Sequence, residues 1–428
     1  MMNNIKINLF DLINENEKRP GSWIMAKGEK LNEILKPLIS ISAIKFSSKR
    51  EFIRYLQNKF NISHSTSNRF IFLKKEWHPL FLIKEVANLV NIPHLKIQEN
   101  IDFLKMNKPP IKVYKAIKEL TKDLCKIAGA HTADGTLHEN FFRINDGYRS
   151  NLFAFNSWIK NVFRIEYPVK KISEKEWCIE FHSGIISAYL RKIFGFPSGM
   201  KQYNVSEPEI IRNASLDFRK SFALGALTFE AGISMKSQIE LCVSSKAFRD
   251  SIAEILNLLD IKFTKMQNKS RKYWRLWSNK LSKEEAKKWI GLFEPKTEKW
   301  FKLNDYIYGY KGKVNSFEEA VGKLDNIYPL KSSSKISFKD VLFAIKALNE
   351  TYRYELASYL CKNKNLNSYG GKWAHSLFPY LNVLKRANII YVKRKKFGKK
   401  KSFGSIIREV YIYNPKIAEW KIPNRTFD

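Results

Sequence analysis

The sequence predicts an α+β protein in which one unit, with the element order αββαββα, occurs twice and builds a saddle of antiparallel strands. Two observations predict this core: a short motif occurs twice, and the same apolar pattern follows each copy. A third observation, helix-like segments on both sides of the core, predicts two flanks. The expected boundaries, in chain order, are 1–112, 113–202, 203–310 and 330–428.

The N-terminal flank, residues 1–112, shows helical spacing of apolar residues, with charged loops between the helical stretches. The segment Ser47-Ser48-Lys49-Arg50 precedes one of these stretches and is suited to cap it. Pro109 and Pro110 mark a linker to the core. The predicted helices are 31–39, 50–59 and 80–90.

The repeated motif is IAGAHTADG at 127–135 and ALGALTFEA at 223–231. Both copies have glycine at the third place, threonine at the sixth and a carboxylate at the eighth. A glycine inside a helix costs about 1 kcal/mol relative to alanine. Gly129 and Gly225 therefore indicate two helices whose backbones nearly touch.

The carboxylates of the motif, Asp134 and Glu230, are followed by Gly135 and Gly232, which are typical helix stops. Both acids are thus expected at helix C-termini, where the helix dipole disfavours an anion. Two carboxylates that converge there would form an oxygen-rich site for a hard divalent cation, Mg²⁺ or Mn²⁺. The alternative is two ordinary helices that each end in an exposed acid.

The segments after the two motif copies carry the same succession of strand-like and helix-like patterns. In the first repeat these are strand-like runs within 136–145, a helix at 152–162, strands at 167–169 and 177–181, and a helix at 185–193. In the second repeat they are strands at 233–235 and 238–243, a helix at 248–259, strands at 261–264 and 273–277, and a helix at 284–293. Two such units side by side would cover one face of the strands with helices and leave the other free for a partner.

The two motifs and this order of elements resemble the LAGLIDADG homing endonucleases in their single-chain, two-motif form. The block GFPSGMK at 195–201 is similar to a glycine-, proline- and lysine-bearing block that family members often carry before the second motif. The resemblance covers roughly residues 115–310. Thr132 and Thr228 depart from it, since the family often has an acid there, and Ala231 stands where glycine is usual.

The resemblance implies a site-specific DNA endonuclease, of intron-homing or freestanding origin, that hydrolyses phosphodiester bonds on both strands. Asp134 and Glu230 would be its catalytic, metal-binding residues. Lys201, from the block, and Lys299, at the comparable place after the second repeat, would polarise water or offset charge. The alternative is a catalytically weak or inactive LAGLIDADG-derived transcription regulator or RNA-splicing cofactor, for which RNA is a possible partner.

The charge of the chain indicates a polyanion partner. It has 76 Lys and Arg against 41 Asp and Glu, a formal net charge of +35. The alternative is a generally lysine-rich proteome. With double-stranded DNA as the partner, the strand residues expected to reach bases and phosphates are Arg143, Lys171, Lys236, Gln238, Lys265, Arg271 and Arg275.

Other features set the class of protein. The sequence has no run of apolar residues long enough for a membrane span and no signal-peptide core, so a cytoplasmic monomer without membrane contact is expected. The four cysteines are too far apart for zinc spacing, and no cofactor beyond the divalent metal is expected. His131 and His138 flank Asp134 and are either local helpers or residues that pack or contact DNA.

The C-terminal flank, 330–428, predicts helices at 338–348, 353–361 and 377–387, and strands at 389–392 and 406–413. Three helices and a hairpin resemble a winged-helix domain, with Gly370, Gly371 and Lys372 before its recognition helix. Pro379 fits the first turn of the third helix. The basic run 393–401 would follow DNA phosphates as the wing, through Lys393, Arg394, Lys395 and Lys399. The alternative for this run is a solvated loop.

Overall fold

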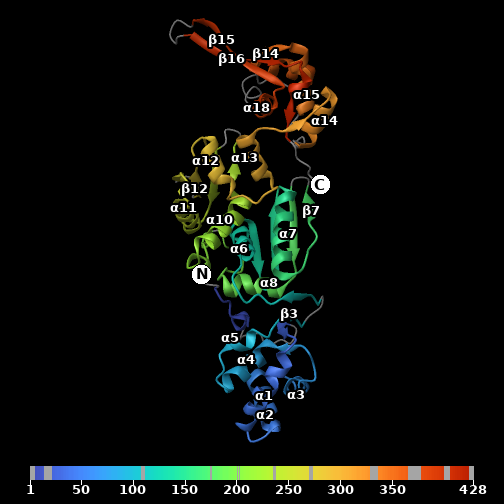
Figure 1. Cartoon of the computed structure of the whole chain (residues 1–428), viewed down its shortest axis with the longest axis vertical. Helices are drawn as coiled ribbons and strands as arrows, with labels where there is room; N and C mark the ends of the chain where they lie inside the picture. Colours follow the sequence, from blue (N-terminus) through green and yellow to red (C-terminus); the bar gives the residue numbers. More distant parts are fainter. Residues whose placement is uncertain are drawn as a thin grey trace. The chain divides into compact units, whose positions relative to one another are not determined.

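The computed structural model describes residues 5–13, 22–107, 111–173, 176–199, 201, 203–234, 238–268, 273–327, 336–364, 377–399 and 405–423. In these ranges the protein mixes helices with antiparallel sheets, and the chain divides into two compact units (Figure 1). The first unit holds nearly all of residues 1–300, and the second holds 301–428 with two short segments, 234–237 and 282–286. No helix in the described ranges is long and apolar enough to cross a membrane.

The N-terminal segment contains the predicted helices but also a sheet that the sequence did not predict. The strands β1 to β4 pair in the order β2-β1-β3-β4. Within the predicted capping segment, Ser48 is the residue that caps α2, because its side chain accepts a hydrogen bond from the Glu51 amide. Pro109 and Pro110 lie outside the described residues. The elements are η1 (Leu9–Leu12), β1 (Ile24–Lys27), α1 (Leu31–Ile44), α2 (Lys49–Phe60), α3 (His64–Ile71), β2 (His78–Pro79), α4 (Leu80–Leu89), α5 (His94–Gln98), β3 (Phe103–Met106) and β4 (Val113–Lys115).

The segment with the first motif forms a helix, two strands, a helix, two strands and a short helix. Its four strands pair in the order β5-β6-β8-β7. Every second residue of β6 is buried, so one face of this sheet packs on the core and the other does not. The elements are α6 (Lys122–Asp134), β5 (Gly135–His138), β6 (Phe141–Asp146), α7 (Arg149–Phe163), β7 (Lys170–Ser173), β8 (Glu176–Phe181) and α8 (Gly184–Ala188), which continues as a π-helical turn, η3 (Tyr189–Ile193).

The segment with the second motif repeats this order of elements. Its strands pair as β9-β10-β12-β11, which is the same first-second-fourth-third order. Ser245 caps α11 through a hydrogen bond from the Phe248 amide. The elements are α9 (Glu209–Arg212), α10 (Leu216–Glu230), β9 (Gly232–Ile233), β10 (Ile239–Val243), α11 (Lys246–Leu258), β11 (Thr264–Asn268), β12 (Tyr273–Trp277), α12 (Lys283–Ile290) and α13 (Glu298–Tyr308).

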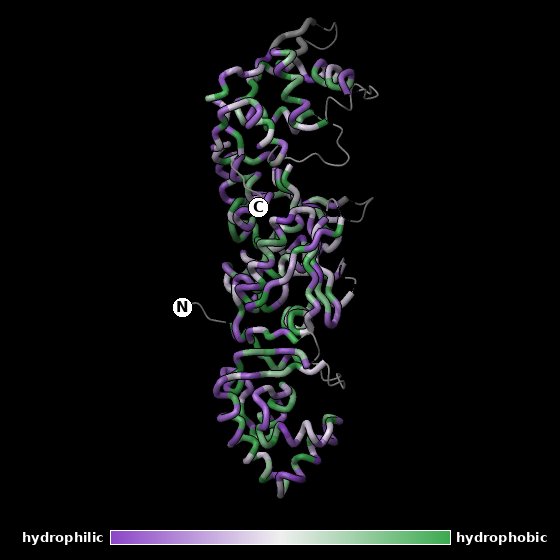
Figure 2. Tube along the Cα trace, turned by 90° about the vertical axis from the view of Figure 1, so that its right-hand side faces the viewer, coloured by the Kyte–Doolittle hydropathy of each residue, from purple (hydrophilic) through white to green (hydrophobic). Residues whose placement is uncertain are grey.

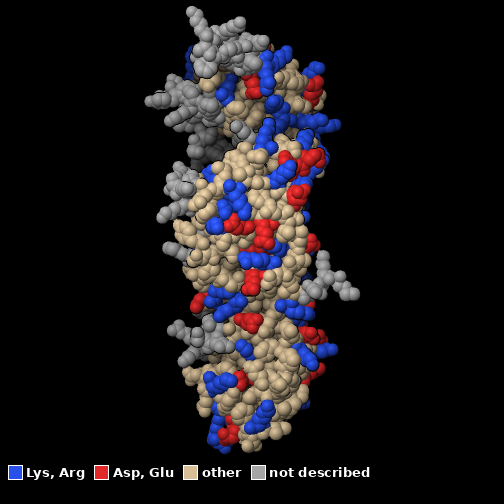
Figure 3. Space-filling model, turned by 90° about the vertical axis from the view of Figure 1, so that its left-hand side faces the viewer, with Lys and Arg blue, Asp and Glu red and all other residues tan. Residues whose placement is uncertain are grey.

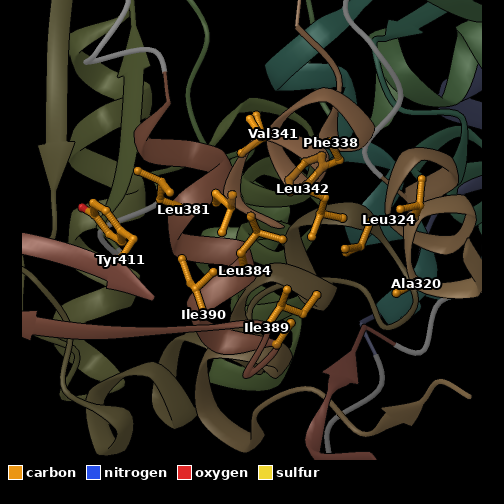
Figure 4. Close-up of a cluster of buried hydrophobic side chains, with 14 of the residues drawn as sticks. Ala320, Leu324, Phe338, Val341, Leu342, Leu381, Leu384, Ile389, Ile390 and Tyr411 are labelled. Atoms are coloured by element: carbon orange, nitrogen blue, oxygen red, sulfur yellow. The ribbon is translucent and has the colours of Figure 1, made fainter. Parts of the chain in front are cut away.

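The second unit contains the predicted helices and a long hairpin, arranged around one apolar core (Figure 4). Pro379 lies in the first turn of its helix, as predicted. The segment with Gly370, Gly371 and Lys372 lies outside the described residues. The elements are β13 (Gly312–Lys313), α14 (Phe317–Ile327), α15 (Phe338–Leu348), β14 (Glu350–Tyr352), α16 (Arg353–Asn363), α18 (Phe378–Arg386), β15 (Ile390–Lys399), β16 (Ser405–Tyr413), η4 (Ile417–Glu419) and β17 (Lys421–Ile422).

The core of the second unit joins its helices to the base of the hairpin. Leu324 of α14, Leu342 of α15 and Leu384 of α18 are fully buried, and Ile389 precedes the hairpin among them. Hydrophobic and hydrophilic residues alternate along the elements of both units (Figure 2). This is the pattern of amphipathic elements around apolar cores.

Candidate active site

The two motif helices, α6 and α10, pack directly against each other (Figure 1). The motif glycines lie at this contact. A β-carbon on Gly129 would lie 2.0 Å from the Phe222 carbonyl oxygen, and one on Gly225 would lie 2.1 Å from that of Lys126. Both distances are far below van der Waals contact, so the two backbones approach as closely as only glycine allows.

The motif carboxylates are the last residues of these two helices, Asp134 of α6 and Glu230 of α10. Asp134 is open to solvent and Glu230 is half-buried. The pKa of Glu230 is raised from its ordinary value to about 7, first because the neighbouring protein removes water from the carboxylate and then because of the negative charge of Asp134. Loss of hydration also raises the pKa of Asp134, while the positive charges of Lys299 and Lys201 lower it. Neighbouring helix ends thus bring two acids into direct electrostatic interaction.

Both candidate lysines reach the same place. The Lys201 ammonium donates to the carbonyls of His131, Thr132 (3.2 Å) and Ala133 (3.3 Å) at the end of α6. The Lys299 ammonium, only 6% exposed, donates to the Phe229 carbonyl (2.5 Å) at the end of α10. Both lysines therefore bind the carbonyls that precede an acid, where a cation is favoured.

Burial opposes the charge of Lys201, and its pKa falls to about 8 although Asp134 and Glu230 favour the charged form. The four side chains form a compact cluster of two acids and two ammonium groups. We call it the acid–lysine cluster (Asp134, Glu230, Lys201 and Lys299). Each acid responds to both lysines.

A further acid beside the cluster, Asp146, was not identified from the sequence. It ends β6, is only 8% exposed, and accepts hydrogen bonds from the Tyr148 amide (2.6 Å) and the Asn151 side chain (2.8 Å). Asn151 also donates to the Thr228 carbonyl (3.1 Å), which links the first sheet to the second motif helix. Burial raises the pKa of Asp146 to about 6, while Lys299 lowers it. The sequence signal was a carboxylate at a strand end.

The two histidines that flank Asp134 differ in exposure. His131 is fully buried between the rings of Phe142 and Phe196, and its two ring nitrogens have no hydrogen-bond partner within the described residues. Burial holds its pKa well below the ordinary value, so it is neutral. His131 is therefore a packing residue, and His138 is exposed on β5.

The cluster offers a metal two carboxylates. Nowhere in the described ranges do three or more His, Cys, Asp and Glu side chains gather as a metal site. Mg²⁺ commonly binds one or two carboxylates and fills its other positions with water and substrate phosphates. The negative charge of Asp134 raises the pKa of Glu230, and a bound cation would offset this repulsion, so the two acids are suited to such an ion. The free cysteines are dispersed and form no zinc site among these residues.

Of the candidate DNA-contacting residues of the first sheet, Arg143 lies on its non-core face, whereas Lys171 pairs with Trp177 and lies at the edge of the core face. Arg143 of β6 donates to Asn145 (2.8 Å) and lies 3.7 Å from a Glu180 oxygen. Lys171 of β7 is exposed, with its ammonium 5.8 Å from the centre of the Trp177 ring. Both cations keep solvent access, so a phosphate can reach them.

In the second sheet, Lys265 of β11 pairs with Asp250 (3.3 Å), and Arg275 of β12 pairs with Glu240 (2.8 Å). Gln238 directly precedes β10. Lys236 and Arg271 lie outside the described residues. On β15, Lys393 and Arg394 are exposed and Lys395 and Lys399 continue the strand, so the basic run is strand rather than loop as far as it is described.

The raised pKa of Glu230 makes the stability of the protein depend on pH. Between the ordinary glutamate value of 4.5 and about 7, the folded protein keeps a proton that the unfolded chain has lost, so stability falls as pH rises through this window. We expect the free energy of unfolding of Glu230→Gln, measured with urea at pH 8, to exceed that of the parent by ~1–2 kcal/mol. The difference should vanish near pH 4.5. Equal urea midpoints at pH 8 would show that Glu230 ionises without cost.

Comparisons with known proteins give structural likenesses only. No family model matches the chain, and no curated protein matches it. A structure of mesophilic variants of the homing endonuclease I-DmoI covers 40% of this chain and 92% of its own, with 15% identity and a TM-score of 0.30. A complex of I-DmoI with DNA and Mn covers 40% and 94%, with 13% identity and a TM-score of 0.29.

Full-length DUF199/WhiA from Thermotoga maritima covers 62% of this chain and 92% of its own, with 11% identity and a TM-score of 0.29. A structure of the N-terminal LAGLIDADG domain of DUF199/WhiA matches 40% of this chain over 80% of its own length, with 11% identity and a TM-score of 0.28. Likenesses of this size leave the function open. The chain is similar in part both to a LAGLIDADG nuclease and to WhiA.

Proposed function

We propose that this protein is a site-specific DNA endonuclease that hydrolyses phosphodiester bonds on both strands with Mg²⁺ or Mn²⁺. The observation that carries the proposal is the placement of Asp134 and Glu230. They hold equivalent places in two copies of one motif and end two helices in backbone contact. Loss of hydration, and then the charge of Asp134, raise the pKa of Glu230 to about 7. A protein in which this pair of acids has no function would be more stable without it.

The residues of the cluster divide the work. Asp134 and Glu230 would hold the divalent ions, which when bound supply an activated water and neutralise charge on the phosphate. Lys201 and Lys299 hold the helix ends through carbonyl hydrogen bonds and keep positive charge beside both acids. The related places of the two acids in the repeats suit two phosphates, one on each strand.

The rest of the proposal concerns DNA. Residues 113–202 and 203–310 would be two LAGLIDADG repeats whose sheets form a saddle, with the non-core strand face on the duplex. Residues 1–112 and the winged-helix-like 330–428 would add DNA contacts. The net charge of +35 supports a polyanion partner. Figure 3 shows Lys and Arg on the surface of both units, with Asp and Glu among them.

The hairpin β15–β16 provides a test of the proposed wing. Lys393 and Arg394 are exposed on β15, opposite Val410 and Glu409 of β16. If both contact phosphates, Lys393→Ala with Arg394→Ala should make the log–log salt dependence of duplex binding shallower by about 1.8. Lys346→Ala, on α15 of the same unit, is the control. An unchanged slope would assign the two residues to a solvated strand.

A second candidate is a DNA-binding regulator or RNA-splicing cofactor without nuclease activity. The acid–lysine cluster favours it in one respect, because two ammonium groups already balance two carboxylates without any metal. Such a cluster could persist as a structural remnant.

The test is cleavage of a plasmid library that carries random target sequences, with Mg²⁺ or Mn²⁺, beside duplex binding in Ca²⁺. The nuclease proposal predicts linear plasmids from which one recurrent site is recovered. Binding in Ca²⁺ without cleavage in either of the other metals would favour the regulator. Preferential binding of a structured RNA would favour the splicing cofactor.

A further inference from the structure

A pocket lies in the N-terminal segment, far along the chain from the acid–lysine cluster. It has a volume of about 130 Å³ and lies between α3 and the strands β1 and β2. Two tryptophans, two cations and two neutral polar side chains contribute to its lining. They are Trp23, Trp77, Arg69, Lys75, Thr66 and Asn107.

The walls of this pocket are fixed by backbone pairing and by buried side chains. Met25 of β1 pairs with Pro79 of β2, and the Asn107 amide donates to the Trp23 carbonyl (3.1 Å). Beneath them His78 is 1% exposed, bonds to the Asn32 side chain (2.5 Å), and packs on the ring of Phe70. Helix α3 and the two strands thus fix part of the wall, while Lys75 and Trp77 come from the short connection 72–77 between α3 and β2.

The charge around the pocket is positive and poorly balanced. Arg69 and Lys75 are exposed at its rim, and none of the described residues that line it carries a carboxylate. The Lys105 ammonium lies 4.2 Å from the centre of the Trp77 ring. Burial, then the charges of Lys75 and Lys27, lower the pKa of Lys105. The carboxylate of Glu76 is engaged with Lys27 (2.6 Å), so the remaining cations favour an anionic ligand.

The size and the aromatic walls restrict the ligand further. Sites for drug-sized molecules measure roughly 300–1,000 Å³, so this pocket holds a much smaller group. Tryptophan faces bind nucleobases by stacking, and a base can reach such a wall only when it is unpaired. Cations at the rim of an aromatic pocket suit the phosphate of the same nucleotide. We infer that this pocket binds one unpaired nucleotide of a nucleic acid, with the base against Trp77 and the phosphate near Arg69 and Lys75.

The inference is tested on the full chain with a short fluorescein-labelled oligothymidylate and a labelled duplex, both in Ca²⁺. Trp77→Ala should weaken oligothymidylate binding about ten-fold, ~1.4 kcal/mol, and leave duplex binding unchanged. Trp77→Phe should restore most of the affinity, because it keeps an aromatic face. Arg69→Ala with Lys75→Ala should make the salt dependence of oligothymidylate binding shallower by about 1.4.

The chain offers a matched control outside the pocket. Phe72 is 47% exposed, with the ammonium groups of Lys49 and Lys74 at 5.3 and 5.6 Å from its ring centre. Phe72→Ala should leave oligothymidylate binding unchanged. Equal losses for Phe72→Ala and Trp77→Ala, equal losses for single strand and duplex, or no loss with Trp77→Ala would overturn the inference. The pocket does not depend on the acid–lysine cluster, so failure here leaves plasmid cleavage intact, and an inactive cluster leaves oligothymidylate binding intact.

Discussion

Asp134→Asn and Glu230→Gln are each expected to abolish double-strand cleavage at the recovered target while duplex binding in Ca²⁺ persists. Each substitution keeps the size of the side chain and removes one of two charges that would hold the metal. Losing a metal-bound carboxylate at the reacting phosphate should cost several kcal/mol of transition-state stabilisation, on the order of 10³-fold in rate. The measurement is the single-turnover rate of cleavage on a plasmid with one target site.

The matched control lies on the same helix as Glu230. Asp217 is in the first turn of α10 and pairs with Lys122 (2.7 Å) on the surface. A surface pair of this kind contributes at most about 1 kcal/mol to stability, so Asp217→Asn should cleave at the parental rate. Double-strand cleavage at the parental rate by either acid variant would contradict the assignment of the metal site. If one variant still nicks a single strand, the two acids serve different strands.

The sequence predicted the position of the acids because the motif carries local signals. Small residues in helical register indicate close helices, and a glycine one residue after Asp134 and two after Glu230 indicates where each helix ends, although the structure holds Gly135 in an extended conformation. The structure places Asp134 and Glu230 at those ends. Lys201 and Lys299 came from the family resemblance and from the comparison of the repeats, and the structure brings both to the cluster.

Other features depended on contacts between distant segments. The strands β1 and β3 are only four residues each, and nothing local distinguishes their pairing from loop. The role of Asp146 depends on Asn151 and on the Thr228 carbonyl, 77 residues from Asn151. The second repeat has Val243 at the corresponding strand end, ahead of the Ser245 cap, so the repeat itself offered no hint. The sequence placed Lys201 and Lys299 near the acids but did not predict that they bind backbone carbonyls.

The largest loss of stability is expected from alanine at the two motif glycines. A β-carbon at Gly129 or Gly225 would lie 2.0 or 2.1 Å from a backbone carbonyl oxygen of the facing helix. Backbone cannot swing aside as a flexible side chain can, so α6 and α10 would have to separate. We expect each single variant to lose about 3 kcal/mol or more of the free energy of unfolding, above the usual cost of an added methyl group in a core. Urea unfolding followed by tryptophan fluorescence measures the loss.

Gly322 is the control for this prediction. It lies inside α14 of the second unit, and nothing lies within 4 Å of the place where its β-carbon would be. Gly322→Ala should therefore be neutral or stabilising, by up to about 1 kcal/mol, because alanine is the better helix former. If Gly129→Ala and Gly225→Ala behave like Gly322→Ala, the two helices are not in backbone contact. Separation of the helices should also move Asp134 away from Glu230, so any folded variant should show a weaker pH dependence of stability between pH 4.5 and 7. The loss of stability and the weaker pH dependence would then both report the same close approach of α6 and α10.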